Sequence, residues 1–218
     1  MNQRPAIRLT PIESLGETLF KLRDYTPIPL VILAIIMGQP TVASLLAGLF
    51  LALFGEVVRI YGVAFIGTIS RTRSYSNGEL VSSGPFALLR NPLYFGNLLL
   101  TLGLSIMPHI WWFPPMVVFY FYVQYIPIVS WEEKKLVTLF GSRYQEYQAK
   151  VPNRWFPRLG QLLKGGWYVA PDSWEPALKS EKRTLTSLVT YLGLMLLLWA
   201  GTWGWLSIPT PLIKVIQP

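Results

Sequence analysis

Long runs of apolar residues, separated by short polar segments, make up most of the 218-residue chain. The longest uncharged stretch starts at Pro92 and continues through Trp131, with a turn-like Met107-Pro108-His109 in its middle. A transmembrane helix needs about 20 apolar residues, and the pattern predicts five membrane spans. They are residues 25–37, 41–67, 93–107, 110–130 and 185–206. The first span is short, so we expect it to be tilted or to borrow residues from the segment before it.

The remaining segments are polar or amphipathic. Residues 1–24 place apolar side chains three and four positions apart among charged ones, which predicts an amphipathic helix at the membrane interface. After Trp131 an apolar stripe recurs at the same spacing on a charged background and predicts a helix that ends at Pro152. The stripe consists of Leu136, Phe140, Tyr144, Tyr147 and Val151. Residues 158–183 are rich in glycine and proline, and we interpret them as a loop.

Composition places the chain in one class. It is 52% hydrophobic and 14% charged, whereas soluble domains carry about 25% charged residues. We therefore expect an all-α polytopic membrane protein that forms a single domain over residues 1–218. With no cysteine and one histidine, His109, the chain lacks the usual thiolate or multi-histidine metal ligands, and we expect no metal.

The distribution of positive charge predicts an orientation. Segments 1–24, 68–92 and 131–183 hold 4, 3 and 10 of the 19 lysines and arginines. Because cytoplasmic loops carry the excess of basic residues, we expect the N-terminus and these segments to be cytoplasmic and the C-terminus to lie on the opposite side. The same rule accounts for the net charge of +8 without a nucleic-acid partner.

Two charges interrupt the second span. Glu56 and Arg59 are three residues apart and therefore share a helical face. Charges at membrane depth are costly, about 2.5–3.5 kcal/mol each on insertion scales. Two interpretations remain open: a local ion pair whose arginine reaches the inner interface, and a polar lining of an internal pocket.

The stretch from Gly84 to Asn97 is the candidate functional segment. Asn91 is disfavoured in the α region because Pro92 follows it, so the chain breaks just before the third span. The short connection between the third and fourth spans predicts antiparallel neighbours. Arg90 and the Glu132-Glu133 pair then lie at the same cytoplasmic mouth, either as interfacial charges or facing one cavity. Hydrolase and nucleotide motifs such as G-x-S-x-G, the P-loop and G-x-G-x-x-G are absent from the sequence.

Two blocks of this region resemble a known superfamily. The first is Gly-Pro-Phe-(x3)-Arg-Asn-Pro-Leu-Tyr-Phe-Gly over residues 84–96. The second is Glu-Glu-(x2)-Leu-(x3)-Phe-Gly-(x2)-Tyr-(x2)-Tyr over residues 132–147. Both are similar to motifs of the isoprenylcysteine carboxyl methyltransferase and phospholipid methyltransferase superfamily, and the resemblance covers residues 77–157. It implies an integral membrane enzyme that transfers a methyl group from S-adenosylmethionine to a lipophilic acceptor.

The resemblance also implies site residues. Carried over position by position, those expected at the cofactor are Leu80, Val81, Phe86, Asn91, Pro92, Tyr94 and Glu132. Arg90 is the catalytic candidate, as the natural anchor for an anionic acceptor head group. Asn91 departs from the family's usual histidine, and Ile128 stands where isoprenylcysteine enzymes carry a substrate-binding arginine. The second departure argues against a prenylcysteine acceptor.

Two alternatives belong to other functional classes. Membrane sterol reductases that use NADPH have a similar core motif, usually followed by an acidic residue, but here Asn97 follows Gly96. A non-catalytic membrane scaffold with a degenerate site is the other alternative. Binding of S-adenosylmethionine, of NADPH or of neither distinguishes the three.

Overall fold

The computed structural model describes residues 9–66, 80–157, 159–165, 167–171 and 173–202, and every regular element within them is helical. Three of the helices are long and apolar enough to cross a membrane, which agrees with the predicted all-α membrane protein. These are α3 (Val42–Ile66), α5 (Phe113–Phe140) and α8 (Glu175–Thr202). Shorter elements are α1 (Pro11–Leu22), α2 (Ile28–Met37), the 3-10 turn η2 (Gly84–Ala87), α4 (Pro92–Ile106), α6 (Ser142–Lys150) and α7 (Leu159–Lys164).

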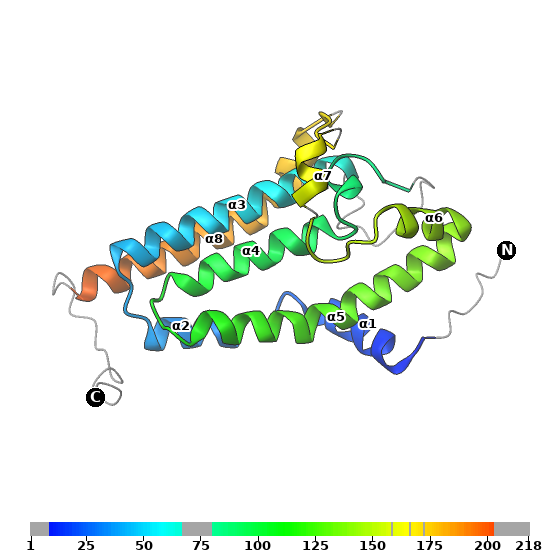
Figure 1. Ribbon diagram of the computed structural model, residues 1–218. Helices are drawn as coiled ribbons and strands as arrows, with labels where there is room; N and C mark the ends of the chain where they lie inside the picture. The colour runs from blue at the N-terminus through cyan, green and yellow to red at the C-terminus, as the bar shows by residue number, and fades with distance from the viewer. Residues whose placement is uncertain (1–8, 67–79, 158, 166, 172, 203–218) are drawn as a thin grey trace.

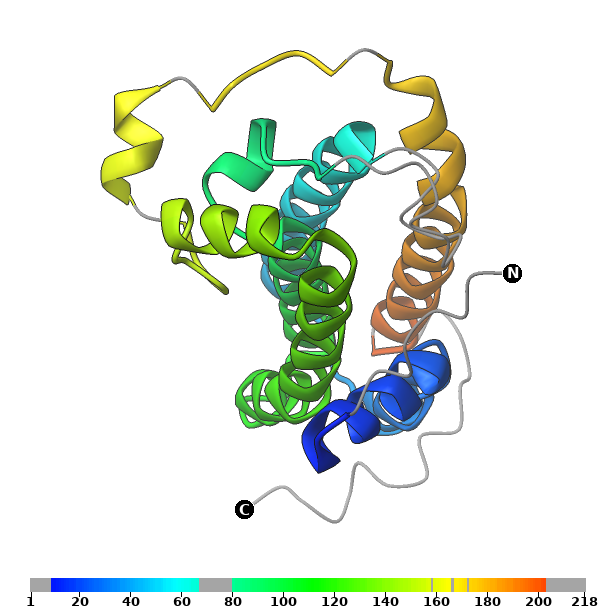
Figure 2. The same ribbon diagram turned by 90° about the vertical axis from the view of Figure 1, so that its right-hand side faces the viewer.

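α3, α5 and α8 run along the long axis of the molecule, and α4 lies between α3 and α5 (Figure 1 and Figure 2). One end of the bundle gathers η2, α6, the start of α4 and the end of α5, whereas the α2–α3 and α4–α5 turns lie at the opposite end. There the backbone N–H of Gln39 donates to the carbonyl of Pro108 at 2.9 Å and joins the two turns. The hairpin predicted from the short 107–110 connection is confirmed, and it places the two motif blocks at one end.

Glycines bring α3 and α4 into close contact. Gly48 and Gly55 on α3 face Gly103 and Gly96 on α4. A Cβ atom on Gly103 would lie 2.5 Å from the backbone nitrogen of Ala52, and one on Gly55 would lie 2.5 Å from that of Leu100. Helices in membranes associate through such small-residue faces, because lipid offers no hydrophobic driving force between them. The close contact with α3 therefore fixes the position of α4, including its first turn.

Replacing Gly103 by leucine should destabilise the protein by about 1–3 kcal/mol or more, since the added side chain forces two backbones apart. Gly193→Leu on α8 is the matched control, because a Cβ there meets nothing within 4 Å. Thermal unfolding of both purified variants in detergent measures the difference. Equal unfolding temperatures for the two variants would refute the close α3–α4 contact.

The apolar helices match the predicted spans in position but not all in length. α2 has 10 residues and α4 has 15, fewer than a perpendicular bilayer span needs. The predicted loop 158–183 was wrong in part, because it contains α7 and because α8 already starts at Glu175. Pro176 falls in the first turn of α8, where a missing N–H costs no hydrogen bond, so proline does not stop this helix.

Some predicted segments extend beyond the described residues. Four parts of the predictions lie outside them: residues 1–8 of the N-terminal segment, Gly67 of the second span, residues 77–79 of the motif region and residues 203–206 of the last span.

The predicted amphipathic helix near the N-terminus is α1, and it packs along α5. Thr10 and Glu13 form a capping box at its start, which satisfies two backbone N–H groups. A Cβ on Gly16 would lie 2.0 Å from the carbonyl oxygen of Pro127, so only glycine allows this approach. One turn later the rings of Phe20 and Trp131 lie 5.0 Å apart. α1 thus covers the face of α5 that leads to the second motif block.

Arg59 forms the local ion pair that the sequence allowed. Its Nε lies 3.4 Å from Glu56 Oε2. The guanidinium also contacts two other helices, because its Nη2 lies 2.7 Å from Glu181 of α8 and its Nη1 bonds Asn97 of α4. Only 15% of the Arg59 side chain is exposed. The ion pair of the first interpretation is therefore present, within a largely buried polar group shared by α3, α4 and α8, and the pocket of the second stays a prediction.

Candidate functional site

The local chain path holds the first motif block between η2 and α4. Gly84 has a positive φ of 58° and begins η2, a conformation that a residue with a Cβ seldom adopts. Asn91 lies outside the helical region, with φ −126° and ψ 60°, and Pro92 is the first residue of α4. The predicted break before Pro92 is therefore confirmed. It leaves Arg90 and Asn91 facing the end of α5.

Glu133 is the centre of the polar contacts in this region. Its Oε1 accepts from Arg90 Nε at 3.0 Å and from Asn91 Nδ2 at 3.4 Å. Its Oε2 lies 3.2 Å from Arg154 Nη2. The side chains of Arg90 and Glu133 are each only 12% exposed. Two guanidinium groups thus bind the two oxygens of this carboxylate. The ion pair between Arg90 and Glu133 joins the first motif block to the second.

Arg90 also binds the segment that follows α6. Its Nη1 donates to the carbonyls of Val151 and Pro152 at 3.1 and 3.0 Å, and its backbone N–H donates to Asn153 at 2.9 Å. Asn91 Nδ2 reaches the carbonyl of Arg154 at 3.2 Å. The chain after α6 is thereby held against the start of α4.

Glu132 has a different environment from its neighbour. Tyr94 donates its hydroxyl proton to Glu132 Oε2 at 2.8 Å. Oε1 receives no hydrogen bond from any residue within the described ranges. Glu132 is partly buried, and Tyr94 is buried in an apolar cluster with Phe20 and Ile128. Glu132 is therefore an oriented carboxylate with one oxygen still able to accept.

A second cluster contains the remaining predicted residues. Leu80 and Val81 pack against buried Phe86, together with Tyr144 and Tyr147 of α6. The hydroxyl of Tyr147 donates to the carbonyl of Phe86 at 2.8 Å. Burial raises the pKa of Tyr144 and of Tyr147 well above the usual tyrosine value, so both hydroxyls stay protonated. The predicted apolar stripe is confirmed, and its role is to anchor η2.

The predicted site residues thus fall into two groups. Leu80, Val81 and Phe86 pack in the cluster with α6, whereas Tyr94 lies in the cluster with residues of α1 and α5 and bonds Glu132. Arg90 and Asn91 connect the two, because they touch both Glu133 and the chain after Val151. No observation in the structure tests the cofactor or catalytic role of any of these residues, and those roles stay predictions.

Arg154 is the contact residue that the sequence did not indicate. Besides Glu133 it bonds Ser130, with Nη2 and Oγ 3.1 Å apart. A single arginine in a short, aperiodic segment has no pattern that reveals a partner 21 positions earlier. Pro152 predicted only that the helix ends there, not where the following chain goes.

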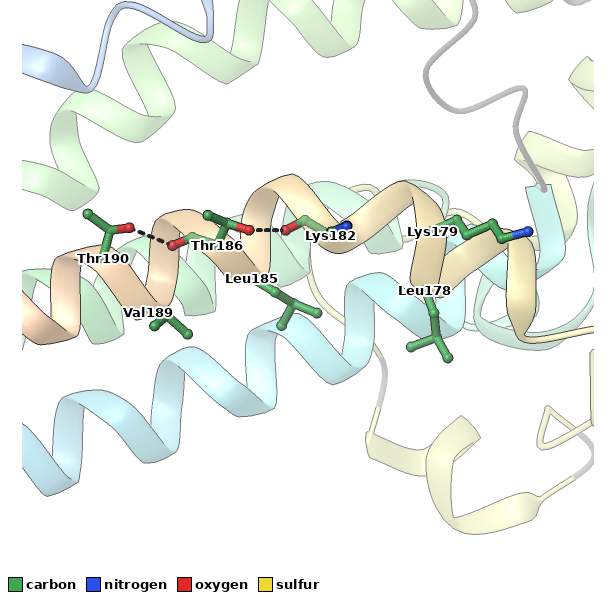
Figure 3. A pocket seen from close by; sticks show the side chains of 7 residues that line it. All are labelled: Leu178, Lys179, Lys182, Leu185, Thr186, Val189 and Thr190. Carbon is green, nitrogen blue, oxygen red and sulfur yellow. Dashed lines mark hydrogen bonds between the residues drawn. The ribbon is translucent and has the colours of Figure 1, made fainter.

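A groove of about 540 Å³ lies on the surface of α8, away from the motif residues. Figure 3 shows Lys179 and Lys182 toward one end and Thr190 and Val189 toward the other. Thr186 and Thr190 donate to the carbonyls of Lys182 and Thr186 at 2.8 and 2.9 Å, so these hydroxyls are satisfied within the helix. None of the lining residues belongs to either motif block.

Fold and motif together define a helical membrane protein whose two motif blocks are joined at one end of its bundle. The model of the phospholipid methyltransferase family matches residues 33–143, just over half of the chain. The chain belongs to this family.

Two curated proteins are similar over part of their length. A cobalt-zinc-cadmium resistance protein, CzcN, of Cupriavidus metallidurans is 33% identical over 118 residues, which are 54% of this chain and 51% of that protein. Protein-S-isoprenylcysteine O-methyltransferase B of Arabidopsis thaliana is 29% identical over 113 residues, 49% of this chain and 56% of that protein. The match therefore spans about half the length of each relative. No solved structure gives a significant match.

Proposed function

We propose that this protein transfers a methyl group from S-adenosylmethionine to a lipophilic acceptor that resides in the membrane. Family membership supports methyl transfer, and the apolar helices support a membrane-borne acceptor. The observation that carries the proposal is Glu132, a partly buried carboxylate fixed by Tyr94 beside the core motif.

The carboxylate of Glu132 suits the ammonium group of the cofactor. S-adenosylmethionine carries an ammonium group, and a carboxylate with one oriented and one open oxygen is a suitable partner for it. We assign Asn91, Pro92 and Tyr94 to the same wall and Leu80, Val81 and Phe86 to an apolar wall for the rest of the cofactor. When bound, the cofactor supplies a methyl group on a sulfonium: the acceptor's lone pair forms the new bond to carbon while the carbon–sulfur electron pair returns to sulfur.

The chain's own contribution is positioning and exclusion of water, because the methyl group arrives already activated. Arg90 was predicted as an anchor for the acceptor. Its bonds to Glu133, Val151 and Pro152 favour instead a role in holding the second motif block in place. Since Glu132 precedes Glu133 directly, fixing the second carboxylate also fixes the first.

The orientation in the membrane is part of the proposal. We infer five spans, a cytoplasmic N-terminus and site, and a C-terminus on the opposite side. The basic segments support this, and the motif-bearing end of the bundle is the end that carries α6 (Figure 1). Reporter fusions after residues 150–170 and at residue 218 should report opposite sides, and a cytoplasmic C-terminus would overturn the span count.

The acceptor is expected to be a membrane lipid or similar lipophile and not a prenylcysteine. Ile128 is fully buried beside Tyr94, one turn before Glu132. An isoleucine cannot pair with a substrate carboxylate, and a buried unpaired carboxylate is strongly penalised. Purified protein with labelled cofactor should therefore label a total membrane lipid extract and leave a farnesylcysteine analogue nearly unlabelled. Preferential labelling of the analogue would contradict this acceptor class.

A further inference from the structure

A chain of polar side chains lies deeper in the bundle than the Tyr94–Glu132 pair. It starts at Arg59 of α3, passes through Asn97 of α4 and reaches Tyr125 of α5. Arg59 is held by Glu181 of α8 at 2.7 Å, so four helices contribute to the chain. Polar groups inside an apolar bundle are costly unless they are paired, and neither motif block includes Arg59, Asn97 or Tyr125.

The direction of the hydrogen bonds along this chain is determined by Arg59. A guanidinium can only donate, so Asn97 presents its Oδ1 to Arg59. Its Nδ2 then points to Tyr125, whose hydroxyl oxygen accepts at 3.4 Å. The proton of the Tyr125 hydroxyl is therefore directed away from Asn97. Within the described ranges no residue accepts it.

The position of Tyr125 brings this donor to the proposed site. Tyr125 precedes Glu132 by seven residues on α5, two helical turns on the same face. Its ring centre lies 5.0 Å from that of Tyr94, whose hydroxyl bonds Glu132. Between them on α5 is buried Ile128. Along this face of α5 the sequence therefore places a carboxylate, then a buried apolar side chain one turn away, then a neutral donor one turn further on.

We propose that the Tyr125 hydroxyl donates a hydrogen bond to an uncharged oxygen of the methyl acceptor, such as an ester or ketone carbonyl or a hydroxyl. Asn97 and Arg59 are positioning residues that turn the Tyr125 proton toward the acceptor. A neutral donor next to Ile128 suits a neutral oxygen, whereas the arginine of isoprenylcysteine enzymes suits a carboxylate. This inference rests on the proposed function, because it names the group that recognises the acceptor of that reaction.

Two substitutions remove the donor in different ways. Tyr125→Phe deletes the hydroxyl. Asn97→Asp keeps the shape but makes residue 97 a pure acceptor, so that the Tyr125 proton turns back to it; the new carboxylate is tolerated because Arg59 lies against it. Tyr120→Phe is the matched control, since Tyr120 is on the same helix and its hydroxyl bonds the carbonyl of Thr26.

The assay is transfer of labelled methyl from S-adenosylmethionine to a total membrane lipid extract in mixed micelles, with the mole fraction of extract varied. Calorimetric binding of S-adenosylhomocysteine is measured on the same preparations. We expect Tyr125→Phe and Asn97→Asp each to raise the half-saturating mole fraction of extract about three- to tenfold, the usual effect of one hydrogen bond. Cofactor-product affinity should stay within twofold of wild type, and the double variant should be no worse than either single one. Tyr120→Phe should match wild type in both measurements.

A negative result for Tyr125 can be distinguished from a negative result for the proposed function. If the wild type binds S-adenosylhomocysteine and labels the extract, but half-saturation is unchanged in Tyr125→Phe, the role of Tyr125 is refuted and the proposed function stands. Additive effects in the double variant would refute the reversal of the hydrogen bond by residue 97. A wild type that neither binds the product nor labels the extract overturns the proposed function and this inference with it.

Discussion

Glu133→Ala is expected to destabilise the protein by about 3–5 kcal/mol, the range for removing one partner of a buried ion pair. The substitution leaves Arg90, with a side chain 12% exposed, without its carboxylate, and it also removes a partner of Arg154. The loss reaches further than one helix, because Glu133 joins the end of α5 to the start of α4 and to the chain after α6. Unfolding of the purified variant by heat or denaturant in detergent measures the effect.

Glu146→Ala is the matched control for this substitution. Glu146 is an exposed carboxylate on α6, and surface charges of this kind contribute little to stability. Its removal should change stability by less than about 1 kcal/mol. If both variants lose the same stability, Glu133 is not the centre of the contacts between the motif blocks.

Replacing the neighbouring carboxylate, Glu132, is expected to weaken cofactor binding without lowering stability. Glu132→Gln should leave the fold intact, because the amide oxygen still accepts from Tyr94. It should weaken binding of S-adenosylmethionine by about 1.5–3 kcal/mol, the range for a hydrogen bond to a charged group. That corresponds to roughly 10- to 150-fold in affinity. Calorimetry on the purified protein measures it.

The two adjacent glutamates can therefore be compared directly, because their substitutions should change different properties. Stability should fall in Glu133→Ala and affinity should fall in Glu132→Gln. Glu146→Gln should change neither, which controls for loss of a carboxylate as such. A folded Glu132→Gln protein with wild-type affinity would remove Glu132 from the cofactor site.

The placement of the motif blocks could be predicted from the sequence because it depends on local features. An uncharged stretch with a short turn makes a helical hairpin, and a hairpin brings its two ends together. The 2.8 Å contact of Tyr94 with Glu132 is the direct consequence. The apolar stripe from Leu136 to Val151 was predictable for the same reason, although Gly141, with φ 56°, divides it between α5 and α6.

Contacts between distant segments were not predictable in this way. Arg59 and Glu181 are 122 positions apart and lie on different helices, and no periodicity in one helix reports the partner on another. The approach of α1 to α5 depends on Gly16 meeting the carbonyl of Pro127, which in the sequence are only a glycine and a proline. The start of α8 was missed because proline in a first helical turn resembles proline in a loop.

The roles of Arg90 and Asn97 illustrate how contacts change an interpretation. In the sequence, Arg90 is a cation within the first motif block and suggests an anchor for an anion. In the structure its guanidinium binds Glu133 and two carbonyls. Asn97 distinguishes the chain from the reductase pattern in the sequence. In the structure its side-chain amide donates to the hydroxyl oxygen of Tyr125 at 3.4 Å.

Binding of the two candidate cofactors to the purified wild-type protein tests the central claim most directly. Calorimetric titrations with S-adenosylmethionine, S-adenosylhomocysteine and NADPH, each with and without a divalent-metal chelator, are compared under one detergent condition. We predict binding of S-adenosylmethionine and S-adenosylhomocysteine that the chelator does not weaken, and no binding of NADPH. Binding of NADPH without S-adenosylmethionine would identify a reductase, and binding of neither by a folded protein would identify a scaffold; either result would contradict the proposed methyl transfer.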